Sequence, residues 1–437
     1  MNVKISRRRL LTAATGPGVA LSACAVGGRP NEQAAVPSLA PVTLEHMDWW
    51  TVALSPLHDQ YLNGVAKEIQ EKYSNITINY TLAPLAQIRE KWIVNSAAGT
   101  PADTSQVSVA FVRYLMEGGM VEPLDGYAAK TPHVAMSQFL ESALFYNQYQ
   151  GKAYGIPHDG PQTQTIAYNA RHFGEVGLNP ARDFTGKWTA DQFLDAARRL
   201  TKKDGQAPRG GFQAPTAGSA ANYTPWLYGF GGDFYAKDYK RVLFNEPRAR
   251  AALQYLVDLR VKHDLLGPDG ATFENEKFSM IVSGTWRYGI IAEQNPQLQF
   301  DFAPMPRGPQ ATAPNSHSFT NMWSMAKAST KKDAAWLYLS HVNSLSTMER
   351  WFGKVYKRLS ARKDFYQSAT WTQMTKEHPT LMDIEKMERG TKEYPWVKPD
   401  EFNRETQGTW RQVYAGTLGV NDALAQMEQI GNRLLGS

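Results

Sequence analysis

Apolar residues along the body of the chain recur at two spacings, one typical of strands and the other of amphipathic helices. The segment 42–50, VTLEHMDWW, predicts a strand, and 76–83, ITINYTLA, predicts a second strand. Between them, apolar residues follow one another at helical spacing. They are Leu57, Tyr61, Val65, Ile69 and Tyr73. A strand, a helix and a strand in this order predict an α/β fold with a largely parallel sheet, whose ligand edge lies at the carboxyl ends of its strands.

Two later segments predict further helices. In 188–202, Thr189 and Gln192 have the spacing of a capping box, which marks the start of a helix. The segment 245–268 has an apolar stripe at helical spacing, and we expect its helix to end at Gly267-Pro268.

The first 41 residues differ from the body in composition. Residues 1–23 place three arginines before a short apolar run and small residues before Cys24, the only cysteine, which predicts a secretory signal peptide. SRRRLL resembles the twin-arginine (Tat) export motif, and LSAC resembles a bacterial lipobox, whose cysteine is lipidated. A chance cysteine in an ordinary Sec signal is the alternative. Residues 24–41 have the composition of a flexible linker.

Most of the net positive charge belongs to this leader. The 437 residues hold 47 Lys and Arg against 41 Asp and Glu, a formal charge of +6. Four of the basic residues lie in 1–23, so 43 basic residues face 41 acidic ones in the remainder, a net of +2. This balance argues against binding of nucleic acid, and a single cysteine excludes an internal disulfide and cysteine-cluster metal sites.

From about residue 42 onward, motifs in a recognisable order resemble the family 1 extracellular solute-binding proteins, the maltose-binding-like receptors of ABC importers. The motifs are AAGTPADTSQV, LMEGGMVEPLDGY, GKAYGIPHDGPQTQTIAYN, HFGEVGLNPARDFTGKWTADQF, FENEKFSMIVSGTWRYG, FAPMPRGP, STKKDAAWLYLSHV and WRQVYAGTLGVNDALAQMEQIGNRL. The chain departs from the family pattern at Glu276-Lys277, where Gly-Lys is usual, and at Phe278, which replaces a small residue.

The resemblance implies an α/β, two-lobed periplasmic-binding-protein-like fold of class II, with a mixed, mainly parallel sheet flanked by helices in each lobe and a hinge between the lobes. The expected bounds are 42–162 with 305–343 for lobe 1, and 166–300 with 347–437 for lobe 2. It also implies a monomer on the outer face of a bacterial membrane. Its partners would be a neutral sugar or short oligosaccharide, the ABC permease subunits and indirectly their ATPase, with no cofactor or metal. A glycerol-phosphate or polyol derivative is the alternative ligand.

Loops at the carboxyl ends of strands are expected to line the cleft between the lobes. Trp49 and Trp50 follow the first strand, and because neighbouring side chains on a strand point to opposite faces, we expect one of them to be exposed. Packing of both under the following helix is the alternative. Trp286 lies at the family's sugar-stacking position in "G.W", with core packing as its alternative.

Further candidates follow other predicted strands or lie on segments that reach the cleft in the family. Asp159 can accept hydrogen bonds from sugar hydroxyls, unless it is an ordinary turn residue. Arg287 and Arg358 would matter for an anionic ligand. The other candidates are Ser108, Phe111, Tyr223, Trp226, Asn321, Trp323, Asn403 and Gln407. Core packing is the alternative for Trp226, and a solvent-exposed helical face is the alternative for Asn403 and Gln407.

An exported hydrolase is a rival interpretation, because His158 adjoins Asp159 and hydrolysis needs acid and base groups. Adjacent residues on an extended segment point apart, however, and the SGT at 283–285 lacks the frame of a nucleophile elbow. The sequence has neither H-E-x-x-H spacing nor a P-loop, so we expect no enzymatic activity. A third interpretation, a structural or adhesion lipoprotein, does not explain why the chain would have two lobes joined by a hinge.

Overall fold

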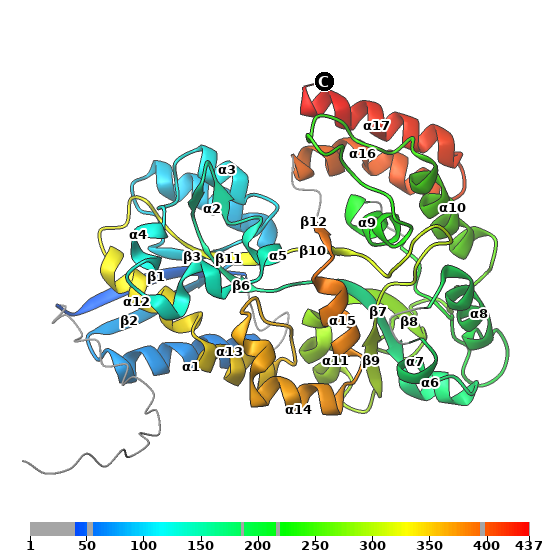
Figure 1. Cartoon of the computed structure of the whole chain (residues 1–437), viewed down its shortest axis with the longest axis horizontal. Helices are drawn as coiled ribbons and strands as arrows, with labels where there is room; N and C mark the ends of the chain where they lie inside the picture. Colours follow the sequence, from blue (N-terminus) through cyan, green and yellow to red (C-terminus); the bar gives the residue numbers. More distant parts are fainter. Residues whose placement is uncertain (1–39, 50–55, 185–187, 216–218, 394–397, 437) are drawn as a thin grey trace, which may run out of the picture. The chain divides into compact units, whose positions relative to one another are not determined.

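The computed structural model describes residues 40–49, 56–184, 188–215, 219–393 and 398–436 (Figure 1). The predicted signal peptide, Cys24, most of the predicted linker and Trp50 lie outside these ranges. Within them, no helix combines the length and the apolar character that crossing a bilayer requires.

The first sheet has five strands in the order β2-β1-β3-β11-β6. β1 runs parallel to β2 and β3, whereas β11 is antiparallel to both β3 and β6. The strands are β1 (Val42–Asp48), β2 (Ile76–Leu82), β3 (Thr104–Val107), β6 (Ile156–Asp159) and β11 (Asn321–Met325). The predicted strand, helix and strand at the start of the body are therefore confirmed.

Helix α1 (Pro56–Lys72) connects β1 to β2 and packs its apolar stripe on this sheet. Tyr61, Val65 and Ile69 are completely buried, as their helical spacing predicts. α1 also contacts α12 (Lys332–Val342), and Figure 1 shows α1 below the sheet, with α2 and α3 above it. Further elements are α2 (Leu85–Ala97), α3 (Val112–Glu117), α4 (Asp125–Ala128), α5 (Glu141–Leu144), β4 (Gln148–Tyr149), β5 (Lys152–Ala153), α13 (Leu345–Met348), α14 (Ala369–Glu377) and α15 (Leu381–Glu388).

The second sheet has the order β8-β7-β9, formed by β7 (Gln164–Asn169), β8 (Met280–Gly284) and β9 (Phe300–Ala303). A mainly parallel sheet was expected here, but β7 is antiparallel to both neighbours. The segment 210–213 runs parallel to β8 beside it, with single bridges from Gln213 to Ile281 of the strand and from Gly210 to Phe278 just before it. β8 and β9 thus share one direction, and β7, which enters directly from the first sheet without a crossover helix, runs against them.

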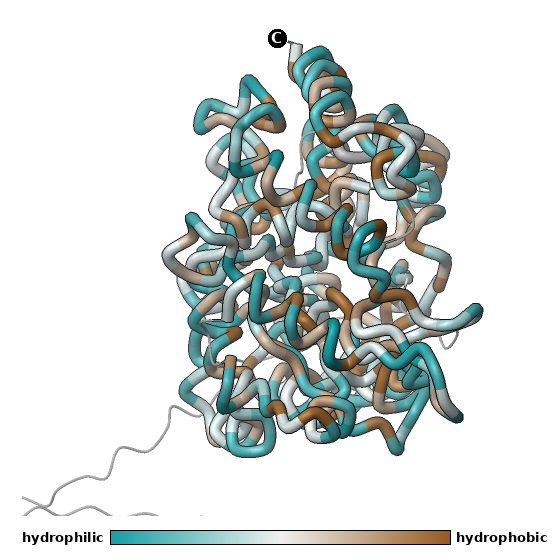
Figure 2. The backbone as a smooth tube through the Cα atoms, turned by 90° about the vertical axis from the view of Figure 1, so that its right-hand side faces the viewer, coloured by the Kyte–Doolittle hydropathy of each residue, from teal (hydrophilic) through white to brown (hydrophobic). Residues whose placement is uncertain are grey.

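Helices surround this sheet and complete the chain. They are α6 (Ala170–Glu175), α7 (Pro180–Asp183), α8 (Ala190–Leu200), α9 (Ala220–Gly229), α10 (Pro247–Val261), α11 (Tyr288–Gln294), α16 (Pro399–Tyr414) and α17 (Val420–Leu435). A short ladder pairs β10 (His317–Ser318) with β12 (Lys392–Glu393). Figure 2 shows hydrophobic and hydrophilic residues alternating along the C-terminal helix, as one buried face requires.

The start of α8 was predicted correctly, and the end of α10 was not. Thr189 and Gln192 exchange both hydrogen bonds of a capping box. α10 ends at Val261 rather than at Gly267, because Asp264, with a φ of 47°, takes the backbone out of the helical conformation. Gly267 instead allows a close backbone contact. A Cβ at this position would lie 2.7 Å from the Lys277 carbonyl oxygen, so a glycine allows the two backbones to approach.

Buried apolar side chains form two clusters that meet at the second sheet. Alternate residues of β7 belong to different clusters: Ala167 to the first, and Ile166 and Tyr168 to the second. The first cluster also holds residues of the first sheet and of α14 and α15, and α15 contacts β9. The two clusters therefore do not divide at 343–347, where the expected bounds pass from lobe 1 to lobe 2, and the lobe bounds stay a prediction.

Candidate functional site

Polar side chains gather at one edge of the first sheet. Asp159 ends β6, Asn321 begins β11, and the two residues are ladder partners. On the other side of β11, Met322 pairs with Val107, which places Ser108 just beyond the end of β3 at the same edge. Because β11 runs against its neighbours, its first residue meets their last residues. The edge predicted from the strand order thus brings together Ser108, Asp159 and Asn321.

The carboxylate of Asp159 is the centre of this edge. Its Oδ1 accepts a hydrogen bond from Arg358 Nη1 at 2.8 Å, and its Oδ2 lies 3.3 Å from the amide nitrogens of both Gln106 and Asn321. The Arg358 guanidinium also lies 4.5 Å from the centre of the Tyr356 ring. Asp159, Asn321 and Arg358 are at most 5% exposed, so this arrangement is a buried, preorganised polar cluster.

Opposing effects act on the Asp159 carboxyl. Burial raises its pKa above the ordinary value, while the Arg358 charge and the Asn321 hydrogen bond lower it. Arg358 provides the opposite charge that a buried carboxylate needs, which makes the pair neutral as a whole.

His158 and Asp159 do not act as a pair. The His158 ring lies between Tyr61, whose hydroxyl is 2.9 Å from Nε2, and Asn343, whose Oδ1 is 3.0 Å from Nδ1. Burial lowers the pKa of His158 to about 3, so the ring is neutral at physiological pH. Asp159 makes its contacts with a different set of residues, as expected of adjacent side chains on a strand. This geometry offers no general acid and base acting on one substrate atom.

Trp286 lies at the end of β8 in the second sheet. It is half-buried in a 3-10 turn, Thr285–Arg287, directly after the strand. Its indole ring leans on Gly284, where an added Cβ would come within 2.4 Å of the ring. Gly284 is the ladder partner of Gln164, the first residue of β7, so Trp286 stands beside the segment that enters from the first sheet.

A cavity of about 530 Å³ opens on the same end of β7. Its lining combines the amides of Gln164, Gln213 and Asn222 with the guanidinium of Arg260 and with the apolar side chains of Phe278 and Val282. Ligand pockets in proteins span roughly 300–1,000 Å³ and mix a few polar groups with an apolar wall. The composition and size of this cavity are therefore those of a small-molecule pocket.

Two other predicted residues have structural partners, and a third is exposed. Arg287 forms an ion pair with Glu274. The Oδ1 of Asn403 accepts a hydrogen bond from the backbone N–H of Ala220 at 3.1 Å, at the start of α9. Gln407 is exposed on α16. The structure does not bring these residues to the polar edge of the first sheet.

The structure places five of the predicted site residues inside the hydrophobic clusters. Trp226 and Trp323 are completely buried, and their rings contact other rings, among them Phe193 for Trp226 and His158 for Trp323. Trp226 therefore corresponds to its core-packing alternative, and Trp323, which was expected in the site, also packs in the core. The Tyr223 hydroxyl donates to the Ala249 carbonyl at 2.8 Å within the second cluster. The other two, Trp49 and Phe111, belong to the first cluster.

Sequence reasoning missed two polar residues of these sites. Gln106 lies on β3, two positions before Ser108, and strand alternation puts both on one face, which was the available signal. Gln164 is the first residue of β7 in a segment already recognised as a crossing. No local pattern distinguishes it from its neighbours.

Comparison with known proteins assigns a class to this arrangement. The family model of the bacterial extracellular solute-binding proteins matches residues 55–346. A binding protein of Brucella abortus (strain 2308) is 25% identical over 292 residues, which cover 64% of this chain and 67% of that protein. A binding protein of Brucella suis biovar 1 (strain 1330) matches to the same extent.

Solved structures share the fold. A maltose/maltodextrin-binding domain from Bdellovibrio bacteriovorus, bound to maltotriose, is 17% identical with a TM-score of 0.73, covering 91% of this chain and all of that one. An ABC substrate-binding protein from Listeria monocytogenes, in complex with cycloalternan, is 19% identical with a TM-score of 0.75, covering 90% and 99%. The fold is thus that of the two-lobed periplasmic binding proteins. The chain belongs to the bacterial extracellular solute-binding protein family.

Proposed function

We propose that this protein is the substrate-binding receptor of an ABC importer and captures a neutral sugar or short oligosaccharide. The ligand would lie between the polar edge around Asp159 and the end of β8 at Trp286. Sugar hydroxyls need directed hydrogen-bonding partners, which Asp159, Asn321 and Ser108 offer. The apolar face of a sugar ring suits an aromatic side chain such as that of Trp286.

The observation that carries the proposal of a neutral ligand is the pairing of two arginines. Arg358 and Arg287 would serve an anionic ligand, but each already has a carboxylate partner, Asp159 and Glu274 respectively. A ligand phosphate would have to compete with these carboxylates for the guanidinium groups. A neutral ligand can hydrogen-bond to the remaining lone pairs of the carboxylate oxygens and to the side-chain amides without breaking either arginine–carboxylate ion pair.

A thermal-shift screen tests the ligand class. The screen contains maltotriose, cycloalternan, simple polyols and a glycerophosphodiester. A ligand at 100 times its Kd stabilises the folded state by roughly 2.7 kcal/mol, so a true ligand raises the melting temperature clearly. We expect stabilisation by a neutral saccharide. Stabilisation by the phosphodiester or a polyol alone would support the alternative ligand class and contradict this proposal.

The same saccharides, analysed by chromatography after incubation, test the absence of catalysis. Recovery of unchanged saccharide is expected of a receptor. A catalytic rate of product formation would identify a hydrolase instead. The separation of His158 from the Asp159 cluster supports the receptor function.

We also propose that the protein is exported by the twin-arginine route and remains on the outer face of the membrane as a lipoprotein, lipidated at Cys24. The lipobox-like LSAC after a short apolar run supports this anchor. The anchored monomer would deliver its ligand to the permease subunits, whose cytoplasmic ATPase drives import.

Cys24→Ser tests the anchor. The variant should move from the membrane fraction to the soluble extract and should lose labelling by a palmitate analogue, because the thiol is the attachment point of the lipid. Equal labelling of wild type and variant would contradict lipidation at this residue.

A further inference from the structure

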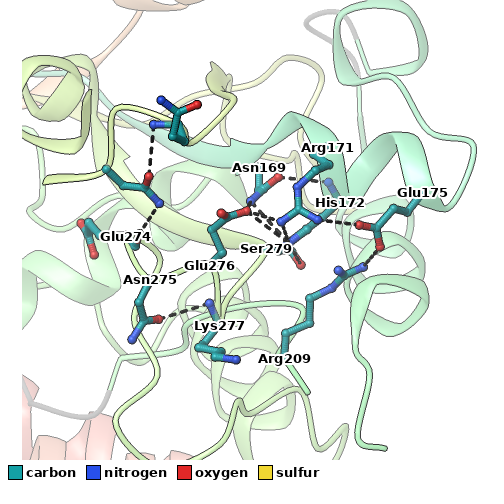
Figure 3. Close-up of polar contacts among 12 residues, drawn as sticks. Asn169, Arg171, His172, Glu175, Arg209, Glu274, Asn275, Glu276, Lys277 and Ser279 are labelled. Carbon is teal, nitrogen blue, oxygen red and sulfur yellow. Dashed lines mark hydrogen bonds and ion pairs between the residues drawn. The ribbon is translucent and has the colours of Figure 1, made fainter. Parts of the chain in front are cut away.

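A second cavity, of about 240 Å³, lies at the opposite end of β7 from Gln164. Its walls come from α6, from the segment after α8 and from the turn before β8, and Figure 3 shows the charged side chains of this region. Asn169, the last residue of β7, accepts from the backbone N–H of His172 and so fixes the start of α6. No residue that lines this cavity also lines the cavity of about 530 Å³ beside Gln164.

The side chains that line this cavity carry more positive than negative charge. The lining has four side chains that are positively charged at neutral pH and two carboxylates. The cations are Arg171, Lys202, Arg209 and Lys277, and the carboxylates are those of Glu175 and Glu276. The excess is two positive charges. The fifth basic residue, His172, adds none at neutral pH, because burial and the nearby charges of Arg209 and Arg171 lower its pKa to about 4.

Both carboxylates already have several donors. Glu175 accepts from Lys202 Nζ at 2.9 Å, from Arg209 Nη2 at 2.8 Å and from Arg171 Nη1 at 3.1 Å. These contacts lower its pKa to about 2, with the Arg209 hydrogen bond as the main cause. Glu276 accepts from Arg171 and, at 3.0 Å, from Asn169 (Figure 3). Neither carboxylate forms an ion pair with Lys277 in the described part of the chain.

The backbone of Lys277 is held firmly at the cavity wall. Its N–H lies 3.1 Å from the Thr272 carbonyl and 3.2 Å from Asn275 Oδ1, and its own carbonyl accepts from Gly210 at 2.9 Å. The preceding residue, Glu276, has a φ of 60°, a conformation that favours glycine. This chain thus carries a carboxylate where the family pattern has Gly, and the hydrogen bonds of that carboxylate to Arg171 and Asn169 hold the turn in place.

We propose that this cavity binds a small dianion, phosphate or a phosphomonoester, chiefly through Lys277, whereas Lys202 and Arg209, which stay paired with Glu175, contribute positive charge around it. A dianion would balance the two excess positive charges. Arg209 is only 4% exposed and is fixed by the Leu200 carbonyl and Glu175, so it forms a rigid positive floor for the site. The Lys277 ammonium group can turn toward a phosphate oxygen while its backbone hydrogen bonds stay in place.

Isothermal titration of the full chain with inorganic phosphate, at low ionic strength, tests the proposal. We expect saturable binding at one site. Lys277→Gln should weaken it roughly tenfold, the loss expected when one charge-assisted hydrogen bond is removed. The matched control is Lys203→Gln, which removes the same charge from a lysine that pairs with Asp264 outside the cavity. The control should bind phosphate within about twofold of wild type.

Two outcomes would overturn the proposal. One is the absence of saturable phosphate binding by the wild type. The other is equal weakening in Lys277→Gln and Lys203→Gln, which would show that phosphate responds only to net charge. Saccharide binding is measured in the same variants, because Lys277 lies outside the candidate sugar site. If Lys277→Gln loses phosphate binding but keeps saccharide binding, the anion is assigned to this cavity. If neither the wild type nor the variants bind saccharide, that result contradicts the proposed function and leaves the phosphate proposal unaffected.

Discussion

The Thr163 hydroxyl donates a hydrogen bond to the carboxylate of Glu388, a residue 225 positions later in the chain. Thr163 lies between β6 and β7, where the chain passes from the first sheet to the second, and Glu388 ends α15. The Ser318 hydroxyl of β10 lies 3.3 Å from the same Thr163 oxygen. One buried carboxyl group therefore joins three segments that connect different parts of the fold, and Glu388 is only 1% exposed.

Glu388→Gln is predicted to change how stability depends on pH. Burial raises the pKa of Glu388 from its ordinary value of 4.5 to about 7. Between these values the unfolded chain releases its proton while the folded protein keeps it, so wild-type stability falls as pH rises and levels off above 7. The shift corresponds to roughly 3 kcal/mol. The neutral glutamine should remove this slope, and urea unfolding of both proteins from pH 4 to 8 measures it.

The control is Glu385→Gln, on the same helix. Its carboxylate pairs with Arg389 at 2.8 Å and makes no contact with Thr163. A flattening of the same size in this variant would show that the slope does not come from Glu388.

A second prediction concerns the buried pair at the sheet edge. Arg358→Met leaves the Asp159 carboxylate buried with amide donors alone, which should cost about 3–5 kcal/mol of unfolding free energy. Adding Asp159→Asn removes the stranded charge, so the double variant should recover most of the loss. Urea unfolding compares the variants. Arg350→Met, which breaks an ion pair of a half-exposed arginine with Glu68, is the control and should cost less than about 1 kcal/mol. Equal losses in Arg358→Met and Arg350→Met would contradict the buried-pair argument.

A third prediction tests the capping box of α8. Thr189→Ala removes the side-chain acceptor for the Gln192 backbone N–H, 3.2 Å away, and should cost about 1 kcal/mol. Gln192→Ala removes the reciprocal hydrogen bond to the Thr189 backbone N–H and keeps the cap itself. We expect the smaller loss from Gln192→Ala, again by urea unfolding. A larger loss there would show that the reciprocal bond, and not the cap, stabilises this end of the helix.

Features that depend on neighbouring residues were predictable from the sequence. The spacing of Tyr61, Val65 and Ile69 indicated the buried face of α1, and the expectation of a ligand edge at the carboxyl ends of strands indicated the edge where β6 ends at Asp159. Contacts between distant residues were not predictable in this way. Arg358 meets Asp159 across 199 positions, and no local pattern shows that its charge is already compensated.

Burial of single aromatic residues was also beyond local reasoning. Trp323 follows a strand pattern in which a tryptophan can either contact a ligand or pack in the core. Which of the two occurs depends on the side chains that cover this face of the sheet. In the structure His46 and His158 lie on the ring, at 4.2 and 4.3 Å between centroids, and both come from other strands. The end of α10 shows the same dependence, because Gly267 is required by its approach to Lys277 and not by the helix.

The last prediction separates a binding tryptophan from a core tryptophan. If Trp286 stacks on a sugar ring, Trp286→Ala should weaken binding of the cognate saccharide by roughly 2–4 kcal/mol, because it removes apolar area and the attraction specific to an aromatic ring. Stability should fall much less, since the side chain is only half-buried beside Gly284. Trp226→Ala is the matched control, with the same change at a completely buried ring, and should cost about 3–5 kcal/mol of unfolding free energy. Calorimetric titration and urea unfolding of the ligand-free proteins give both quantities. A Trp286→Ala protein that binds saccharide normally but unfolds as easily as Trp226→Ala would place Trp286 in the core and remove it from the proposed site.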